Sequence, residues 1–326
     1  MSEPPQNWRP SASRELLTQR AALLAQTRAF FAQRGVLEVD TPMLVNAAVT
    51  DVHIESAVVQ LAPRSQAYFL HTSPEYAMKR LLAAGSGDIF QICHVVRGAE
   101  RSRLHNPEFT LLEWYRLGFS MEQLMDEVDA LARALLGGAC VDYPTEHLSY
   151  REAFRRHLDL DPFTADVARL EHIAQALGYR SAGAGDARRD ELLELLVSAS
   201  VGPRLGRGTL TFLHHYPASQ AALAQLDAQQ PGTALRFELY CEGVELANGF
   251  QELTSAAEQH RRFEQDREER RRRRLPAIEV DERLLAALAA GLPACAGVAL
   301  GFDRLLMLAV GAREIEAVLS FPTESA

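Results

Sequence analysis

The chain has 326 residues, and its apolar fraction of 47% and charged fraction of 24% are ordinary for a globular protein. The formal net charge of −9 argues against a general nucleic-acid binder, because such proteins usually present a basic surface. The four cysteines form no C-x-x-C pair and the histidines are dispersed, so we expect neither a zinc site nor a disulfide framework. Neither a signal peptide nor a membrane-spanning run is evident, which predicts a cytoplasmic protein.

The first predicted element is a helix over residues 14–33, where apolar residues recur at helical spacing. Ser13 is its expected N-cap and Gly35 its expected C-cap. A strand-like piece, VLEVDTPML, follows and ends at a proline. Short β-rich pieces then dominate, namely HIESAVVQL, QAYFLHTS, DIFQICHVV and EFTLLEWYR. Another helix is predicted from Ser120 to about Leu136.

The stretch from about Arg151 to Ala228 is predicted to be mostly helical, as an insertion between two β-rich halves. Strands return with ALRFELYCEGVELANGF, and a charged helix and a last apolar stretch follow. Strands that are largely antiparallel in spacing and flanked by helices predict an α+β fold, with residues 1–326 as a single domain. Neither a G-x-G-x-x-G sequence nor a P-loop occurs, so a nucleotide must be held in another way.

The charged helix contains the segment REERRRRRLP, residues 267–276. Acidic and basic residues at i,i+4 spacing, such as Glu258 with Arg262 and Asp266 with Arg270, favour an exposed helix face. The same spacing pairs Glu268 with Arg272 and Glu269 with Arg273. The alternative is a docking patch for an acidic macromolecule, with the run 270–274 as part of it.

Two clusters in the first half carry groups suited to chemistry. In HTSPEYAMKRLL, a helix start is expected at Ser73-Pro74-Glu75. These residues could bind a ligand, or they could simply cap the helix. In HVVRGAERSRLHNPEFTLLEWYR, two antiparallel strands flank a loop that carries Arg101 and Arg103. Such a hairpin could lay guanidinium groups over phosphates and stack a ring on a base. A plain surface hairpin is the alternative.

Two further clusters lie in the second half. Glu238 and Glu245 are seven residues apart, so alternation would place them on opposite strand faces. A turn at Glu242-Gly243 would let them meet, and paired carboxylates suit a divalent metal or a cationic substrate. In GVALGFDRLLML, Arg304 follows a glycine turn at a helix start and could receive a phosphate, unless it forms an ordinary salt bridge.

Taken in order, these clusters resemble the motifs of class II aminoacyl-tRNA synthetases. Residues 35–42 are similar to motif 1, Arg97 with residues 105–109 to motif 2, and residues 297–304 to motif 3. The segments TSPE, HNPEFT and ELANGFQE are similar to the corresponding sequences of the lysyl branch. The resemblance runs from about residue 14 to the end of the chain, apart from the variable middle.

This resemblance implies the class II catalytic core, a mixed and mostly antiparallel sheet flanked by helices, with a helical insertion at about 151–228. Only about a dozen residues precede the first helix, so we expect no anticodon-binding OB-fold. The chain is therefore similar to stand-alone catalytic paralogues of the lysyl branch. These activate a lysine or β-lysine with ATP and transfer it to a lysine side chain of elongation factor P. The resemblance also implies a homodimer with Pro42 at the interface. The acidic net charge and the expected lack of an OB-fold argue against tRNA as a partner.

The resemblance implies a role for each matched residue. Arg97 and Arg304 would be the catalytic pair, at the α-phosphate and the far phosphate. ATP would be bound by Arg97, Gly98, Ala99, Asn106, Phe109, Glu245, Leu246, Gly301 and Arg304. Lysine would be bound by Ser73, Glu75, Glu113, Tyr115, Asn248, Glu252 and Ala299. Glu238 and Glu245 would hold Mg²⁺.

Two positions depart from the family's pattern. Motif 2 usually reads F-R-x-E, but Ala99 stands where the glutamate would bond the adenine amino group. Ala299 stands where lysyl-tRNA synthetases tend to have glycine, and its methyl group could favour a β-amino isomer. Two alternatives remain at this stage. One is a truncated lysyl-tRNA synthetase-like enzyme with another acceptor, and the other is a catalytically silent regulatory paralogue.

Overall fold

The computed structural model describes residues 8–62, 67–98, 101–179 and 185–326. The chain divides into two compact units. The first contains the chain through Phe119, Leu131–Gly137 and everything from Leu253 onward, and the second contains Ser120–Ala130 and Gly138–Glu252. The predicted helix at α3 (Met121–Leu136) is confirmed, and its residues are shared between the two units.

Four strands lie side by side in the first unit, in the order β1 (Leu37–Glu38), β5 (Ile89–Val96), β6 (Glu108–Leu117) and β11 (Cys295–Gly301). β1 pairs with β5 in parallel, while β5–β6 and β6–β11 are antiparallel. The strands predicted at DIFQICHVV and EFTLLEWYR are therefore confirmed. A small second sheet has the order β2 (Leu44–Val45), β4 (Tyr68–Leu70), β3 (Val58–Val59).

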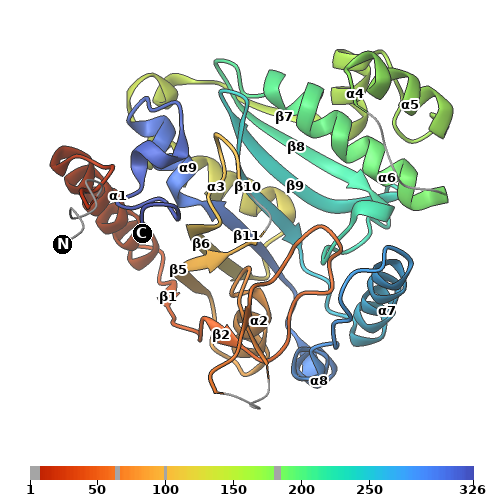
Figure 1. Ribbon diagram of the computed structural model, residues 1–326, viewed down its shortest axis with the longest axis horizontal. Coiled ribbons are helices and arrows are strands. Elements are labelled where there is room, and N and C mark those ends of the chain that lie inside the picture. The colour runs from red at the N-terminus through yellow and green to blue at the C-terminus, as the bar shows by residue number, and fades with distance from the viewer. Residues whose placement is uncertain (1–7, 63–66, 99–100, 180–184) are drawn as a thin grey trace, which may run out of the picture. The chain divides into compact units, whose positions relative to one another are not determined.

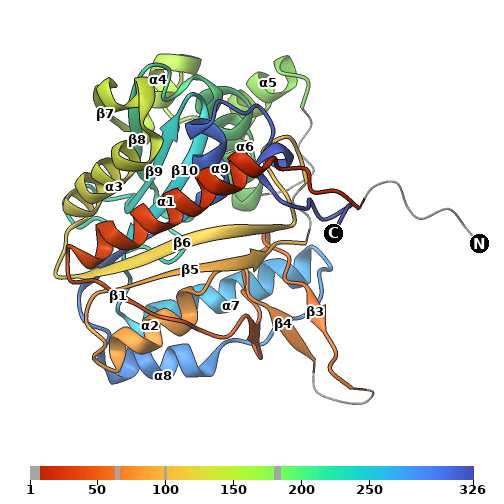
Figure 2. The same cartoon turned by 90° about the vertical axis from the view of Figure 1, so that its left-hand side faces the viewer.

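Helix α1 (Arg14–Ala32) covers one face of these strands, as Figure 2 shows. Phe31 stacks on Phe90 of β5 at 4.4 Å and meets the Trp114 ring of β6 at 5.3 Å, centroid to centroid. Ser13 caps the helix as predicted, whereas the C-cap is Gln33, two residues before the predicted Gly35. Because side chains alternate along a strand, the neighbours of Phe90 and Trp114 face away from α1. That opposite face carries the candidate site.

The other helices of the first unit are α2 (Glu75–Ala83), α7 (Ala256–Arg272), α8 (Glu282–Gly291), α9 (Phe302–Ala309) and the 3₁₀ helix Ile315–Val318. α7 is the predicted charged helix. Its pairs Glu258–Arg262 and Glu269–Arg273 form at 2.9 and 2.6 Å. Arg272 pairs with Glu269, at i,i+3 spacing, where Glu268 was predicted. Asp266 accepts a hydrogen bond from Thr50, and the nearby charge of Arg270 opposes the rise of its pKa that burial causes.

One arginine of α7 is not on its solvated face. Arg270 is only 6% exposed and donates to the carbonyl oxygens of Asp51 and Pro276 at 2.9 and 3.1 Å. Its guanidinium thus links the end of α7 to the loop that contains Asp51. The hypothesis of a docking patch over 270–274 is therefore wrong at Arg270.

The second unit also has four adjacent strands, in the order β10 (Val244–Gln251), β9 (Thr233–Cys241), β8 (Leu210–Pro217) and β7 (Thr145–Ser149). Figure 1 shows its helices α4 (Tyr150–Leu158), α5 (Val167–Ala176) and α6 (Gly185–Leu196) together beside these strands. The unit also has a π turn at Val197–Val201 and 3₁₀ turns at Gly138–Asp142, Gly202–Arg204 and Ala218–Gln220. The segment 151–228 contains α4, α5 and α6 and connecting loops, as predicted, but it also contains β8, which the sequence did not indicate.

β9 and β10 form the predicted hairpin. Its two turn residues, Glu242 and Gly243, have φ values of 51° and 74°, as a two-residue turn between twisted strands requires. A Cβ on Gly243 would lie 2.7 Å from the Pro203 carbonyl oxygen, so glycine is needed there for space as well. The α+β fold class is confirmed, because each unit contains mostly antiparallel strand pairs flanked by helices.

Candidate active site

A buried carboxylate, Glu113, lies on the face of β6 opposite α1. Ser73 Oγ donates to it at 2.6 Å, and the Tyr115 hydroxyl donates at 2.7 Å. Ser73 is fixed just before α2, where its Oγ also accepts a hydrogen bond from the backbone N–H of Glu75 at 3.0 Å. The structure therefore brings together three of the predicted substrate residues.

The environment of Glu113 shifts its ionisation. Burial raises the pKa of Glu113 to about 7, with a further contribution from the negative charge of Glu75. The hydrogen bonds from Ser73 and Tyr115 and the charge of Lys79 oppose this rise. The side chain is 2% exposed, so a ligand that carries positive charge would find a carboxylate poorly solvated by water. Such a group suits the binding of an ammonium ion.

Lys79 is a charged side chain that the sequence interpretation missed. It is 1% exposed, and its Nζ donates to Glu75 Oε1 at 2.6 Å. The i,i+4 spacing of the two residues in α2 was the available signal. Glu75 thus already has a cation from its own chain, and a substrate amino group would share this carboxylate. α2 begins at Glu75 with Pro74 as N-cap, one residue later than predicted.

Three residues lie in a row across the strands. Glu113 pairs with Gln91 of β5 on one side and with Ala299 of β11 on the other. Directly opposite residues of antiparallel strands share a face, so the predicted Ala299 lies beside the carboxylate. Gln91 was not predicted, although its alternation with Phe90 could have indicated it. Neither polar atom of its buried amide has a hydrogen-bond partner in the described part of the chain.

Arg97 and Phe109 form the other end of the first unit's site. Arg97 follows β5; its guanidinium carbon lies 5.3 Å from the centre of the Phe109 ring, and its Nε donates to the Thr72 carbonyl at 3.3 Å. Gly98 N donates to the Glu55 carbonyl at 3.0 Å, while Ala99 lies outside the described residues. Phe109 and Glu113 share one strand face about 13 Å apart, at about 3.3 Å per residue.

The charged residues at the start of α9 have separate partners. Asp303, 1% exposed, pairs with Arg20 of α1 at 2.5 Å and accepts from the backbone N–H of Thr110 at 2.7 Å. Arg304 instead reaches the loop between β5 and β6, where its Nη2 lies 2.6 Å from His105 Nε2 and its Nε donates to the Leu104 carbonyl at 3.2 Å. Asp303 thus fixes the helix, and Arg304 meets the motif 2 loop.

Gly301 precedes this helix with a φ of −70°, and an added Cβ would make only ordinary contacts, the nearest 3.6 Å from Arg304 Cδ. Neither the backbone nor the packing of the protein requires glycine there. Close approach of a ligand to the backbone therefore remains the prediction for this position.

Asn106 links this loop to the last residues of the chain. Its side chain is 6% exposed, and its Nδ2 donates to the Glu108 carbonyl at 2.6 Å and to Thr323 Oγ1 at 3.0 Å. Its Oδ1 accepts from the backbone N–H of Thr323 at 3.3 Å. Both amide hydrogens are thus used within the protein, so the amide has none left to donate to a nucleotide in this arrangement.

The second unit places its predicted residues on the β9–β10 hairpin. Glu238 is buried, and its two oxygens accept from Arg236 Nη2 at 2.6 Å and from the Tyr240 hydroxyl at 2.7 Å. Glu245 pairs opposite Tyr240, and Asn248 opposite Glu238. The two glutamates therefore share one face, as predicted.

The remaining predicted residues of this hairpin have buried side-chain atoms. Asn248 Oδ1 is buried and has no hydrogen-bond partner within the described ranges. The side chains of Leu246 and Glu252 are buried too, each 1% exposed.

The glutamate pair fits Mg²⁺ held jointly with phosphates. Carboxylate oxygens are the ligands that Mg²⁺ prefers, and each oxygen of Glu238 accepts one of the two hydrogen bonds from Arg236 and Tyr240, which leaves a second lone pair. Among the described residues no cluster of three or more His, Cys, Asp or Glu side chains could hold a metal ion. Mg²⁺ commonly completes its octahedron with water and substrate phosphates, so a pair of carboxylates is compatible with it, and the metal site stays a prediction.

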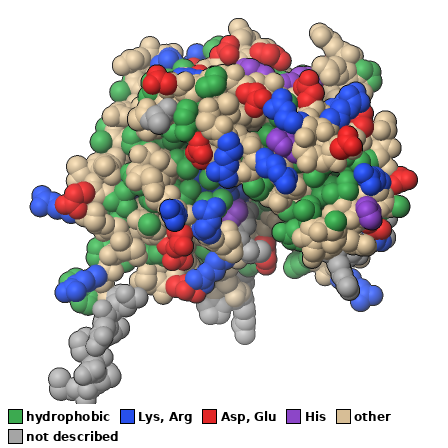
Figure 3. Space-filling view, turned by 90° about the horizontal axis from the view of Figure 1, so that it is seen from above, with side chains coloured by type: hydrophobic (Ala, Val, Ile, Leu, Met, Phe, Trp, Pro, Cys, Tyr) green, Lys and Arg blue, Asp and Glu red, His purple; other side chains and the backbone are tan. Residues whose placement is uncertain are grey.

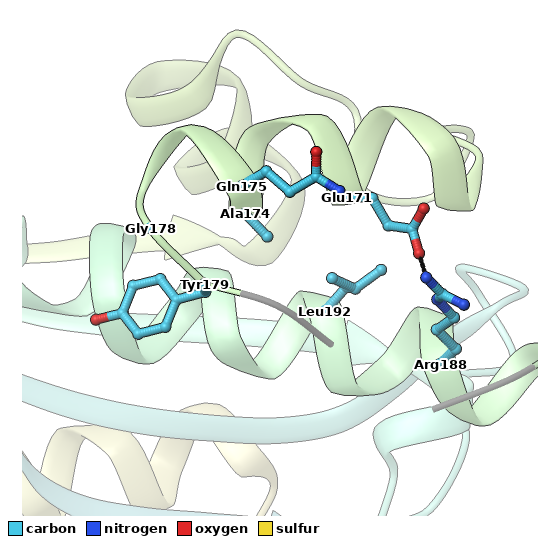
Figure 4. A pocket seen from close by; sticks show the side chains of 7 residues that line it. All are labelled: Glu171, Ala174, Gln175, Gly178, Tyr179, Arg188 and Leu192. Atoms are coloured by element: carbon cyan, nitrogen blue, oxygen red, sulfur yellow. Dashed lines mark ion pairs between the residues drawn. The ribbon is translucent and has the colours of Figure 1, made fainter. Parts of the chain in front are cut away.

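A pocket of about 570 Å³ lies within the helical part of the second unit (Figure 4). Leu192 of α6 faces Ala174 and Gln175 of α5 across it, and the Glu171–Arg188 ion pair closes one side. None of its lining residues is among those predicted from the motifs. We therefore assign this pocket no role in the candidate active site.

The buried carboxylate on β6, the arginine beside Phe109 and the arginine at the start of α9 are the features expected of a class II synthetase core. Residues 6–325 match the model of the family "tRNA synthetases class II (D, K and N)", and the chain belongs to this family. It is therefore an enzyme of a family of ATP-dependent ligases, as predicted.

More particularly, the chain is similar to proteins named elongation factor P–(R)-β-lysine ligase. Those of Salmonella paratyphi B and Salmonella schwarzengrund are each 49% identical over 323 residues, which cover 98% of this chain and 98% of the relative. On the face seen in Figure 3, acidic and basic side chains are interspersed. Within the described ranges, the structure has no helix both long enough and apolar enough to cross a membrane.

Proposed function

We propose that this enzyme activates (R)-β-lysine with ATP and transfers it to a lysine side chain of elongation factor P. One observation carries the chemistry: Glu113, a buried carboxylate suited to an ammonium ion, shares a strand face with Phe109. Their separation along the strand exceeds the length of an extended amine-bearing side chain, whose reacting carboxylate would then lie toward Arg97. The names of the similar proteins support the choice of substrate and acceptor.

In the first step, a carboxylate oxygen of the lysine attacks the α-phosphorus of ATP, and the bond to pyrophosphate breaks. The enzyme forms no covalent bond, so its contribution is positioning and charge stabilisation. Arg97 would face the α-phosphate and the carboxylate, and Arg304 the far phosphate. Glu113 would fix the distal ammonium ion, since an unpaired buried charge costs several kcal/mol.

In the second step, the amine of the acceptor lysine attacks the acyl carbon, the bond to AMP breaks, and the amine loses a proton. Glu238 and Glu245 would hold Mg²⁺, which when bound offsets negative charge on the phosphates. Ala299, beside Glu113, would favour the β-amino isomer through its methyl group. A methyl group discriminates by only about 10- to 200-fold, so some activity with L-α-lysine is expected.

The test is pyrophosphate release with ATP and Mg²⁺, comparing (R)-β-lysine, L-α-lysine and other amino acids. Release that prefers β-lysine, followed by a mass increase on elongation factor P, supports the proposal. Glu113→Gln is the matched control and should lose lysine-dependent release. Release only with L-α-lysine and transfer only to tRNA would indicate a truncated synthetase. No release with any amino acid would indicate a silent paralogue.

A homodimer that uses the motif 1 segment at Pro42, and a cytoplasmic location, are further parts of the proposal. The dimer rests on the family resemblance alone, and the location rests on the sequence, in which neither a signal peptide nor a membrane-spanning run is evident. The dimer is tested by the mass of the native protein in solution, with a substitution at Pro42 expected to weaken it.

A further inference from the structure

The loop Arg101–Asn106, between β5 and β6, contains internal hydrogen bonds that fix part of its conformation. Ser102 and His105 form a small bridge, in which each backbone N–H donates to the other's carbonyl at 3.2 and 3.1 Å. Ser102 Oγ lies 2.6 Å from His105 Nδ1. The other ring nitrogen of His105 meets Arg304. The position of this loop therefore decides where His105, and with it Arg304, is placed.

The segment Arg313–Glu324 lies along this loop and bonds to it at several points. Ile315 N donates to the Arg103 carbonyl at 2.9 Å, and Arg103 Nη1 donates to the Arg313 carbonyl at 2.6 Å. Thr323 is bonded to Asn106 through both its backbone N–H and its hydroxyl. Arg101 also pairs with Glu324 and, at 4.0 Å, with Glu316.

These contacts do not contribute equally to fixing the position of the loop. The side chains of Arg101 and Glu324 are 52% and 66% exposed, and ion pairs in such settings contribute little. Asn106 is buried, and a buried amide that loses a partner incurs the full cost of its desolvation. The link from Thr323 to Asn106 should therefore be the contact that fixes the loop.

We propose that Thr323 is a positioning residue of the nucleotide site, acting through Asn106 on His105 and Arg304. The inference rests on the proposed function, in which this loop and Arg304 bind ATP. It assigns to the end of the chain, beyond the three motifs, a role in nucleotide affinity. It also explains why the Asn106 amide is committed within the protein.

The experiment is calorimetric titration with a non-hydrolysable ATP analogue and Mg²⁺, beside a separate titration with (R)-β-lysine. In Thr323→Val, a methyl group of the same size replaces the hydroxyl and cannot accept the hydrogen bond from Asn106 Nδ2, so analogue affinity should fall about 5- to 10-fold. Thr323→Ser keeps the hydroxyl and should bind as the wild type does. Thr323→Ala admits water and should lie between the two. Glu324→Gln should change the affinity by less than about twofold.

The affinity for β-lysine should stay unchanged in all four variants, because the hydrogen bonds that fix Glu113 come from Ser73 and Tyr115 and not from this segment. Equal analogue affinity of Thr323→Val and the wild type would overturn the inference. So would an equal loss of affinity for both ligands, which indicates general loosening. Thr323 is itself exposed, so its substitution should leave the fold intact. A wild-type protein that binds neither ligand would instead refute the proposed function.

Discussion

The charge state of Glu113 should control lysine binding between pH 6 and pH 8. The pKa of this carboxyl is raised from 4.5 to about 7, so the folded protein without ligand holds a proton that the unfolded chain has lost. The stability that this group contributes is therefore present below pH 4.5 and is lost as the pH rises through about 7. Ligand binding has the opposite dependence, because an ammonium ion selects the ionised carboxylate.

The size of the effect follows from the ionised fraction. With a pKa of about 7, roughly one molecule in eleven is ionised at pH 6 and about ten in eleven at pH 8. The affinity for (R)-β-lysine should therefore rise about tenfold over this interval and then level off. Calorimetric titration without ATP measures it directly, and avoids the titration of the nucleotide's own phosphates.

Glu113→Gln is the control, since an amide does not titrate in this range. Its affinity should be flat between pH 6 and pH 8 and weaker than the wild type at pH 8 by about 30-fold or more. A flat wild-type profile would refute the assignment of a raised pKa. A variant that keeps the wild-type slope would show that another group titrates.

Three substitutions test other parts of the structure. Asp303→Asn removes a buried charge and leaves its arginine partner unpaired, so the free energy of unfolding in urea should fall by about 2–4 kcal/mol. Arg304→Lys keeps the charge but loses the planar fork, and the affinity for an ATP analogue should fall about tenfold while β-lysine affinity is unchanged. Gly206→Ala places a Cβ 2.6 Å from the Tyr240 carbonyl oxygen at a φ of +69° and should destabilise by more than about 2 kcal/mol. Gly208→Ala, at a φ of +66° with nothing within 4 Å, is its control and should cost only about 1 kcal/mol.

Much of the local structure could be predicted because its causes lie within a few residues. Ser13 before an apolar-periodic segment was enough to place the start of α1, and Glu242-Gly243 was enough to place the β9–β10 turn. The strands β5 and β6 followed from their apolar, β-branched and aromatic content. β8 was not predicted, because its residues are surrounded in sequence by helices and turns, and its pairing partners are distant.

The residues of the candidate site also differ in whether the local sequence was enough to find them. The acidic and basic residues of the motifs were found from their order and spacing, and the same face for Glu238 and Glu245 followed from the turn. Gln91 and Lys79 were missed: alternation with Phe90 and the i,i+4 spacing with Glu75 were available as signals, but neither shows that these side chains are buried near Glu113. Their significance depends on the pairing of β5 with β6 and on the packing of α2.

The sequence by itself determined the fold class and the family, because these depend on periodicity, turn residues and short motifs, and it supplied the residues to which the proposal gives the chemistry. Only the tertiary structure decided how the charges are paired. Asp303 and Arg304 are neighbours in the chain, yet one pairs with a helix 283 residues away and the other with the loop before β6. Thr323 and Asn106 are 217 residues apart and are joined by two hydrogen bonds. Such partners are chosen by packing, since a buried polar group must find whichever complementary group the folded chain brings within hydrogen-bond distance.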